Sequence, residues 1–286
     1  MVNRTIKKRL AQSLILFLVM AVPALVSAAS SPVHIFVSIL PQKFFVERIA
    51  GDLAEVDVMA GPGQSPETYE PSPRQLSRLS SADIYFSIGV PFEKVWMPRI
   101  HVMNEHLIIV DTSKNAHALF SSREVEDPHI WVSPPAAIRI AEEMMETMVM
   151  VDPENTETYR QNYEHLVMDL ERLDQEIRKI LDGWLGKGKF LVMHPAWGYF
   201  AKTYGLTQIA IEKEGKAPTP RYLQKLIKRA REYKIQVVFI QQQHSGQLAM
   251  VVAKAIGARV EKIDPLAESY IENMRHVAEV LAESFK

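Results

Sequence analysis

The segment 155–182 contains neither Gly nor Pro and carries apolar side chains at steps of three and four residues. Such spacing places these side chains along one face of a helix. Asp152 and Pro153 suit a helix start, and Gly183 suits a stop. At 1.5 Å per residue the helix would be about 40 Å long, enough to brace two bodies along one side. The pattern therefore predicts a long linking helix, with an ordinary core helix of a single domain as the alternative.

Short β-type runs alternate with helical segments on both sides of this predicted helix. The expected strands are 33–39, 54–59, 84–87 and 107–110 before it, and 190–193, 207–211, 237–240 and 259–263 after it. Such alternation is typical of an α/β fold with a mostly parallel sheet flanked by helices. We therefore predict two α/β lobes, residues 31–150 and 185–286, joined by a rigid linking helix within 151–184.

The N-terminal segment 1–28 has the layout of a cleavable secretory signal. Four cations and no acid precede Leu10, an apolar run covers 14–22, and small residues lead up to Ala28. The apolar run is shorter than the roughly 20 residues of a membrane-spanning helix. We expect cleavage after Ala28. Because the sequence contains no Cys, a lipid-anchored N-terminus is not expected, and the mature protein is predicted to be free in the periplasm.

Charge and cysteine content narrow the classes of ligand. Removal of segment 1–28 leaves 29 Lys and Arg against 34 Asp and Glu, a formal net charge of about −5. That balance argues against nucleic acid or anionic lipid as a partner. Without Cys there is neither a disulfide nor a thiolate ligand, so a bound metal would be held by His and carboxylate side chains.

The nine histidines differ in their sequence surroundings, and neutral imidazole is the commonest nitrogen ligand for transition metals. Five stand alone in strands, on helices or among surface charges, and we interpret them as core or solvated residues: His34, His101, His106, His165 and His276. His117, in a polar loop, and His244, after three glutamines, are candidates for an accessory role. His129 and His194 remain as the main candidates.

Candidate metal ligands cluster near predicted strand ends. His194 closes an apolar strand, and His129 lies within Asp-Pro-His-Ile-Trp at 127–131. Glu67 and Asp264 follow the strands ending near Met59 and at Ile263. Polar residues at the carboxyl ends of parallel strands face the crevice where open α/β sheets bind ligands. Both carboxylates also have a structural interpretation, because Asp before Pro starts turns and Glu in loops is usually solvated.

Five short motifs carry a resemblance to a known family. They are Pro-Glu-Thr-Tyr-Glu-Pro at 66–71, Ala-Asp at 82–83 with Gly89 beyond it, Asp-Pro-His-Ile-Trp at 127–131, His-Pro-Ala-Trp-Gly-Tyr-Phe at 194–200, and Ile-Asp-Pro-Leu at 263–266. In order and spacing the chain resembles the metal-binding solute-binding proteins of ABC importers, cluster A-I, which handle zinc, manganese and iron. The resemblance covers essentially the whole mature chain.

This resemblance implies a monomeric carrier that delivers one divalent transition-metal ion to an ABC permease in the inner membrane. It implies that His129, His194 and Asp264 are metal ligands. Glu67 stands where family members usually have His, so the resemblance does not by itself assign Glu67 as a metal ligand. The chain also lacks the His-rich loop of many zinc members, since 115–126 holds only His117, and it has Gln241 where members often carry an acid.

Two interpretations of Glu67 remain open. As a ligand, Glu67 would complete a set of two imidazoles and two carboxylates. This set suits manganese or ferrous iron better than the usual family set, which has His at the position of Glu67. If it points away, three ligands remain, completed by water, His117 or His244. Zinc is the expected ion, because it outcompetes manganese at most mixed nitrogen and oxygen sites.

Two other functional classes compete with the carrier. A secreted metallohydrolase would use the same ligands with an open water position, but the sequence has no His-Glu-x-x-His, no Gly-x-Ser-x-Gly and no phosphate-binding Gly-rich loop. A surface adhesin is the third class, and no sequence feature is specific to it. We therefore predict a non-enzymatic carrier.

Overall fold

The computed structural model describes residues 31–120, 127–212 and 217–286. Residues Pro32–Lys286 form one compact unit. The predicted signal segment 1–28 and its cleavage point lie outside the described residues. Within the described ranges, no helix is long and apolar enough to cross a membrane.

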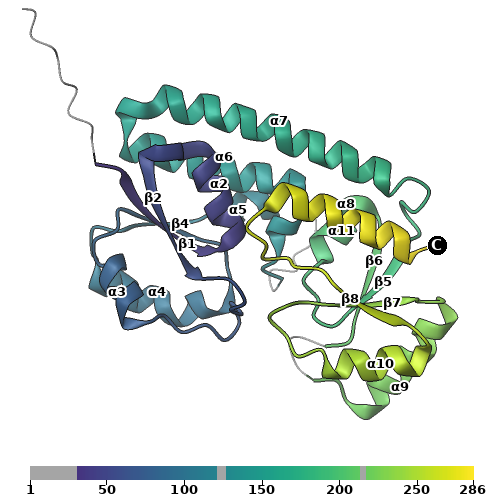
Figure 1. Cartoon of the computed structure of the whole chain (residues 1–286). Helices are drawn as coiled ribbons and strands as arrows, with labels where there is room; N and C mark the ends of the chain where they lie inside the picture. The colour runs from purple at the N-terminus through teal and green to yellow at the C-terminus, as the bar shows by residue number, and fades with distance from the viewer. Residues whose placement is uncertain (1–30, 121–126, 213–216) are drawn as a thin grey trace, which may run out of the picture. The chain divides into compact units, whose positions relative to one another are not determined.

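The N-terminal lobe is built on a sheet of four parallel strands in the order β2-β1-β3-β4 (Figure 1). The central strand β1 is buried along nearly its whole length, as expected for a parallel sheet covered by helices on both faces. The strands are β1 (Val33–Ile39), β2 (Ala54–Ala60), β3 (Ile84–Ser87) and β4 (Ile108–Asp111), and the helices are α2 (Leu40–Ala50), α3 (Pro73–Leu79), α4 (Pro91–Met103) and α5 (Ser113–His117), with a 3₁₀ turn at Gly51–Leu53.

The C-terminal lobe repeats this plan with four parallel strands in the order β6-β5-β7-β8. In each sheet the first strand of the lobe, β1 or β5, lies second from one edge. The second strand lies on one side of it and the third on the other, so the strand order reverses at β1 and at β5. Its strands are β5 (Lys189–Val192), β6 (Thr207–Ala210), β7 (Val237–Ile240) and β8 (Arg259–Lys262), and its helices are α8 (Gly198–Tyr204), α9 (Pro220–Glu232), α10 (Gln247–Ile256) and α11 (Tyr270–Ser284). The prediction of two parallel α/β lobes is confirmed.

Two long helices join the lobes. Helix α6 (Pro134–Val151) leads through a 3₁₀ turn at Pro153–Asn155 into α7 (Thr156–Ile180), which confirms the predicted long helix. Helix α7 packs against α6 and α2 at one end and against α11 at the other (Figure 1). Ion pairs tie α7 to a helix on each side: Arg48 of α2 lies 2.7 Å from Asp169 near the middle of α7, and Arg275 of α11 lies 2.8 Å from Glu176 in its C-terminal part. One helix therefore braces elements of both lobes.

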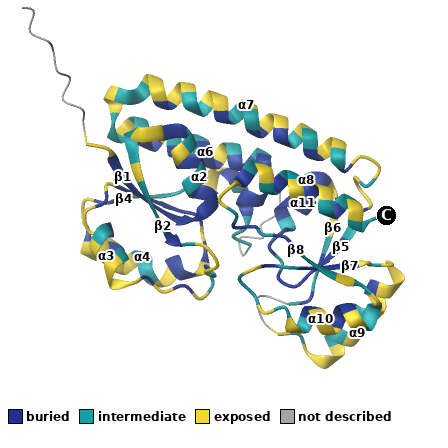
Figure 2. Ribbon diagram, viewed as in Figure 1, coloured by how far each residue is buried: buried dark blue, intermediate teal, exposed yellow. Residues whose placement is uncertain are grey.

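The hydrophobic core is continuous across the two lobes. A large cluster of buried side chains runs from the N-terminal sheet through α6 and the inner face of α7 to Trp197 and α11. Figure 2 shows α7 buried on this inner side and exposed on the outer one. A second, smaller cluster lies where α9 and α10 pack with the strands of the C-terminal sheet. The shared cluster holds the two lobes in contact.

Hydrogen bonds across the lobes fix the segment that carries His129. Trp131 lies in the 3₁₀ turn Ile130–Val132, and its indole nitrogen donates to the Pro265 carbonyl at 2.7 Å. The Tyr270 hydroxyl in turn donates to the Trp131 carbonyl, also at 2.7 Å. All these groups are buried, so the bonds are shielded from water. They hold the turn after His129 against the loop that follows β8.

Candidate metal centre

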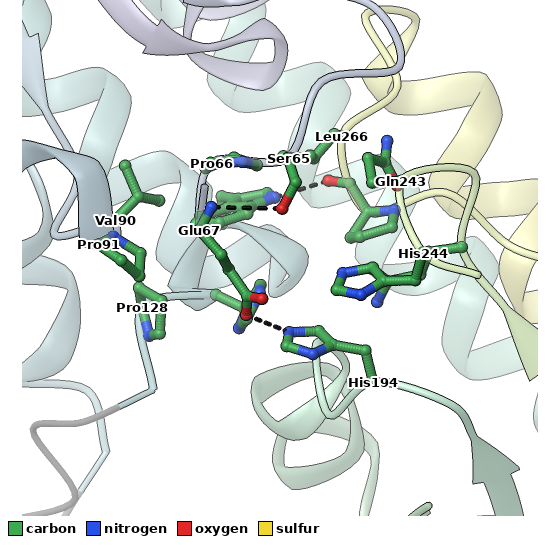
Figure 3. A pocket seen from close by; sticks show the side chains of 14 residues that line it. Ser65, Pro66, Glu67, Val90, Pro91, Pro128, His194, Gln243, His244 and Leu266 are labelled. Atoms are coloured by element: carbon green, nitrogen blue, oxygen red, sulfur yellow. Dashed lines mark hydrogen bonds and ion pairs between the residues drawn. The ribbon is translucent and has the colours of Figure 1, made fainter. Parts of the chain in front are cut away.

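A small pocket lies where loops of both lobes meet (Figure 3). Its volume is about 20 Å³, room for about one water-sized particle. The walls come from loops after β2, β3, β5, β7 and β8 and from the turn before α6, with these lining residues: Ser65, Pro66, Glu67, Val90, Pro91, Pro128, His129, Trp131, His194, Gln241, Gln243, His244, Pro265 and Leu266. Most of these segments follow the carboxyl ends of parallel strands, where open α/β sheets bind ligands.

His194 is the most deeply buried of the candidate ligands, with 4% of its surface exposed. Its Nδ1 lies 2.9 Å from Oε2 of Glu212, which follows β6. A carboxylate can only accept a hydrogen bond, so Nδ1 carries the proton and Nε2 has a free lone pair. This bond from His194 lowers the pKa of the Glu212 carboxyl, which keeps it ionised. The imidazole is therefore fixed in the tautomer that binds a metal through Nε2.

The free Nε2 of His194 points into the pocket. It lies 3.0 Å from Oε1 of Glu67, but the pair lacks hydrogen-bond geometry, and Nε2 is a buried atom without a hydrogen-bond partner among the described residues. A buried polar atom left in this state costs about 1–3 kcal/mol. A cation between the two atoms would satisfy both at once, because each offers a lone pair.

His129 is oriented in the same way by a second carboxylate. Oδ1 of Asp127 accepts hydrogen bonds from Nδ1 of His129 at 2.8 Å and from its backbone nitrogen at 3.0 Å. Burial alone would raise the pKa of Asp127, but the hydrogen bonds and charge of His129 outweigh it and lower the pKa. The His129 and His194 rings have centroids 5.3 Å apart, and both line the same small pocket.

Glu67 reaches the pocket from the loop after β2. Figure 3 shows its side chain directed toward His194. Its backbone nitrogen donates to the Ser65 hydroxyl at 3.3 Å, which helps to hold the loop, and 30% of its side-chain surface is exposed. The carboxylate thus brings a negative charge to the free nitrogen of His194.

His244 also belongs to this group. Its ring stacks on His194, with centroids 4.5 Å apart and planes 16° apart. Burial, and next the nearby His194, lower the pKa of His244, which favours the neutral ring. One potential ligand atom from each of Glu67, His194 and His244 lies within 4.8 Å of the other two. These three residues form the tightest set of metal-binding atoms in the described part of the chain.

Asp264 lies beside the pocket and is not among its lining residues. Its Oδ1 accepts hydrogen bonds from Nε2 of Gln243 at 3.1 Å and from the backbone nitrogen of Leu266 at 2.9 Å. The backbone carbonyl of Asp264 accepts a bond from the Asn273 side chain at 2.7 Å. Glu67, His129 and His194 therefore line one pocket together with His244, and Asp264 makes hydrogen bonds that hold neighbouring loops.

His117, a candidate for an accessory role, is not among the residues that line the pocket. It ends α5, and its Nδ1 lies 3.0 Å from the Tyr199 hydroxyl. Burial lowers the pKa of the His117 imidazole. Two residues that orient the candidate ligands were not predicted. Asp127 could have been recognised two positions before His129, and Glu212 from its place after the strand 207–211.

The site suits a single borderline cation. Neutral imidazoles and one carboxylate are ligands that zinc accepts in proteins, and the cavity is too small for a sugar, peptide or nucleotide. The fold and the site together define a two-lobed solute-binding protein with a metal site between parallel-sheet lobes.

The family description of the periplasmic zinc-uptake complex component A, ZnuA, matches residues 35–284, and the chain belongs to this family. The family consists of solute-binding transport proteins that work with ABC permeases. The resemblance drawn from the sequence motifs is therefore confirmed.

Individual relatives agree with the family match. The high-affinity zinc uptake system protein ZnuA of Bacillus subtilis (strain 168) is 27% identical over 251 residues, covering 82% of this chain and 78% of the relative. A crystal structure of ZnuA is 38% identical, with a TM-score of 0.83, and the match covers 89% of this chain and all of the other. A ZnuA deletion mutant with zinc bound has a TM-score of 0.82 at 38% identity, over 89% and 98% of the two chains.

Proposed function

We propose that this chain is the periplasmic solute-binding component of an ABC importer that captures one zinc ion between its lobes and delivers it to a permease in the inner membrane. The observation that carries this proposal is the buried Nε2 of His194. Glu212 fixes it in the metal-binding tautomer, and it faces Glu67 without a hydrogen-bond partner among the described residues.

Three of the predicted ligands supply the core of the site: Glu67, His129 and His194. Each imidazole is backed by a carboxylate, Asp127 or Glu212, and such partners raise the basicity of the ligand and hold its ring. Asp264 was predicted as the fourth ligand, and it lies beside the pocket.

Zinc is the ion that the donor set favours. At mixed nitrogen and oxygen sites zinc binds more tightly than manganese or ferrous iron in the usual order of divalent metals. The named relatives support the same choice, since the Bacillus subtilis protein is a zinc-uptake component and the ZnuA deletion mutant was solved with zinc. A manganese or ferrous-iron carrier of the same family is the alternative, and Glu67 is the residue that would favour it.

The cellular setting is part of the proposal. Cleavage after Ala28 would release a chain without a Cys for lipid attachment, so we propose a soluble monomer in the periplasm. The lobe boundaries proposed are 31–150 and 185–286, with the linking helix between them. Mass spectrometry of the protein exported from a bacterial host would read the mature N-terminus directly.

Competitive titration tests the ion and the site together. Metal-stripped mature protein would be titrated with zinc and with manganese against a chromophoric chelator, beside His194→Ala and His276→Ala. We expect one tightly bound zinc per chain, a large loss for His194→Ala and no change for His276→Ala, whose histidine is exposed on α11. Absence of tight binding by the wild-type protein would refute the zinc carrier, and tighter binding of manganese would refute the choice of ion.

A further inference from the structure

The loop after β7 brings a third imidazole to the pocket. His244 lines the pocket and stacks on His194 at 4.5 Å, and one of its ring nitrogens lies within 4.8 Å of the ligand atoms of Glu67 and His194. The ring has no hydrogen bond or ion pair to another side chain in the described ranges that would give it a structural role. A half-buried imidazole whose ring nitrogen lies this close to two other candidate ligand atoms has the position of a ligand.

Asp264 is occupied by other bonds. Its Oδ1 accepts from Nε2 of Gln243, the residue before His244, and from the backbone nitrogen of Leu266. The first bond ties the loop after β7 to the loop after β8, and the second forms the tight turn that an Asp before Pro commonly makes. The carboxylate therefore holds the His244 loop in place from behind the pocket wall.

We propose that His244 is the fourth metal ligand of this chain and that Asp264 is a positioning residue that holds the His244 loop. The inference rests on the proposed zinc-binding function and concerns the ligands of that same site. The donor set is then three imidazoles, from His129, His194 and His244, and the carboxylate of Glu67.

The proposed donor set contains one more nitrogen ligand than the set of Glu67, His129, His194 and Asp264 that the sequence predicted. With Glu67 and Asp264 as ligands the ion would meet two imidazoles and two carboxylates, whereas with His244 it meets three imidazoles and one carboxylate. Nitrogen-rich sets favour zinc over manganese, which prefers oxygen. His244 thus offsets the carboxylate at position 67 and keeps the site selective for zinc.

The conservative variant Asp264→Asn separates ligand from positioning residue. The amide oxygen of Asn can still accept the bonds from Gln243 and Leu266, but it is a far weaker zinc ligand than a carboxylate. We expect Asp264→Asn to bind zinc within about threefold of the wild-type affinity. We expect His244→Ala to weaken binding by at least about 100-fold, beyond the usual 10- to 100-fold effect of an outer partner. His276→Ala is the control.

X-ray absorption of the zinc-loaded wild-type protein gives a second measurement that depends on no variant. Three imidazoles around zinc in the wild type, and two in His244→Ala, are expected. Two imidazoles in the wild type would overturn the proposal, whatever the variants do, and three would uphold it even if Asp264→Asn also weakened binding. Zinc affinity unchanged in His244→Ala and lost in Asp264→Asn would likewise overturn it while leaving the zinc carrier intact. A wild-type protein that binds no zinc would instead refute the proposed function.

Discussion

Gly198 begins α8 and faces the Asp127 carboxylate that orients His129. A Cβ at position 198 would lie 2.7 Å from Oδ2 of Asp127, whereas ordinary contacts begin near 3.4 Å. In Gly198→Ala, Oδ2 of Asp127 must therefore retreat by about 0.7 Å, and if the whole carboxylate moves by this amount the 2.8 Å hydrogen bond that its Oδ1 accepts from His129 lengthens to about 3.5 Å, beyond useful range. A hydrogen bond to a charged group contributes about 1.5–3 kcal/mol, or about 10- to 150-fold in affinity.

We expect Gly198→Ala to raise the zinc Kd by about 10- to 100-fold, the range seen when a partner behind a metal ligand is lost. Folding should suffer little, because Asp127 has a short side chain that can move and Ala favours a helix over Gly by about 0.5–1 kcal/mol. Competitive chelator titration would measure affinity, and thermal unfolding of the metal-free protein would measure stability.

Gly61→Ala is the matched control for this experiment. Its new Cβ would lie 3.6 Å from Oε1 of Gln64, an ordinary contact, at a glycine far from the His129–Asp127 pair in the sequence. A zinc Kd for Gly198→Ala within twofold of the wild-type value would refute the argument that Gly198 makes room for this carboxylate. Equal losses in both variants would show a general cost of replacing glycine.

Three further predictions concern selectivity, pH and packing. Glu67→His should raise the ratio of zinc to manganese affinity, and an unchanged or lower ratio in competition titrations would contradict the role given to Glu67. Burial raises the pKa of Glu93 to about 7 despite hydrogen bonds from Ser38, Ile88 and Gly89, so the folded chain takes up this proton before the unfolded chain does as pH falls. Stability should therefore fall as pH rises from about 4.5 to 7, and Glu93→Gln should remove up to about 3 kcal/mol of that fall in urea unfolding at pH 5 and 8; an unchanged pH profile would count against it. Leu170→Ala, in the buried face of α7, should cost about 2–5 kcal/mol of unfolding free energy, and a loss below 1 kcal/mol would mean that α7 is not part of the shared core.

The strands were predictable because they are buried on both faces. All eight predicted strands exist, and each end lies within one residue of the observed one; for example, 259–263 was expected and Arg259–Lys262 is observed. Continuous apolar runs between polar turns are a strong signal for parallel strands. Helix α6 was not singled out, since its pattern merged with the N-terminal lobe ahead of Asp152.

Candidate ligands could be predicted only where a strand end or a local motif marked them. Glu67 and His194 follow predicted strands and His129 lies in the Asp-Pro-His-Ile-Trp motif; the three side chains line one pocket, and their role as ligands stays a prediction. His244 follows three glutamines, a sequence typical of a solvated turn, and its place beside His194 depends on the neighbouring strands β5 and β7. Asp264 has the same sequence context whether it binds an ion or forms a turn, so only its hydrogen bonds distinguish the two.

The size of the cavity has a consequence for the route of the ion. A space of about 20 Å³ holds an ion but not its coat of water molecules, so a cation must exchange nearly all of its water for protein ligands before it is enclosed. Magnesium gives up its water reluctantly and prefers oxygen ligands, whereas zinc exchanges water readily for imidazole. We therefore expect entry to act as a dehydration filter, in which abundant hydrated cations are disfavoured before ligand preference acts on the transition metals.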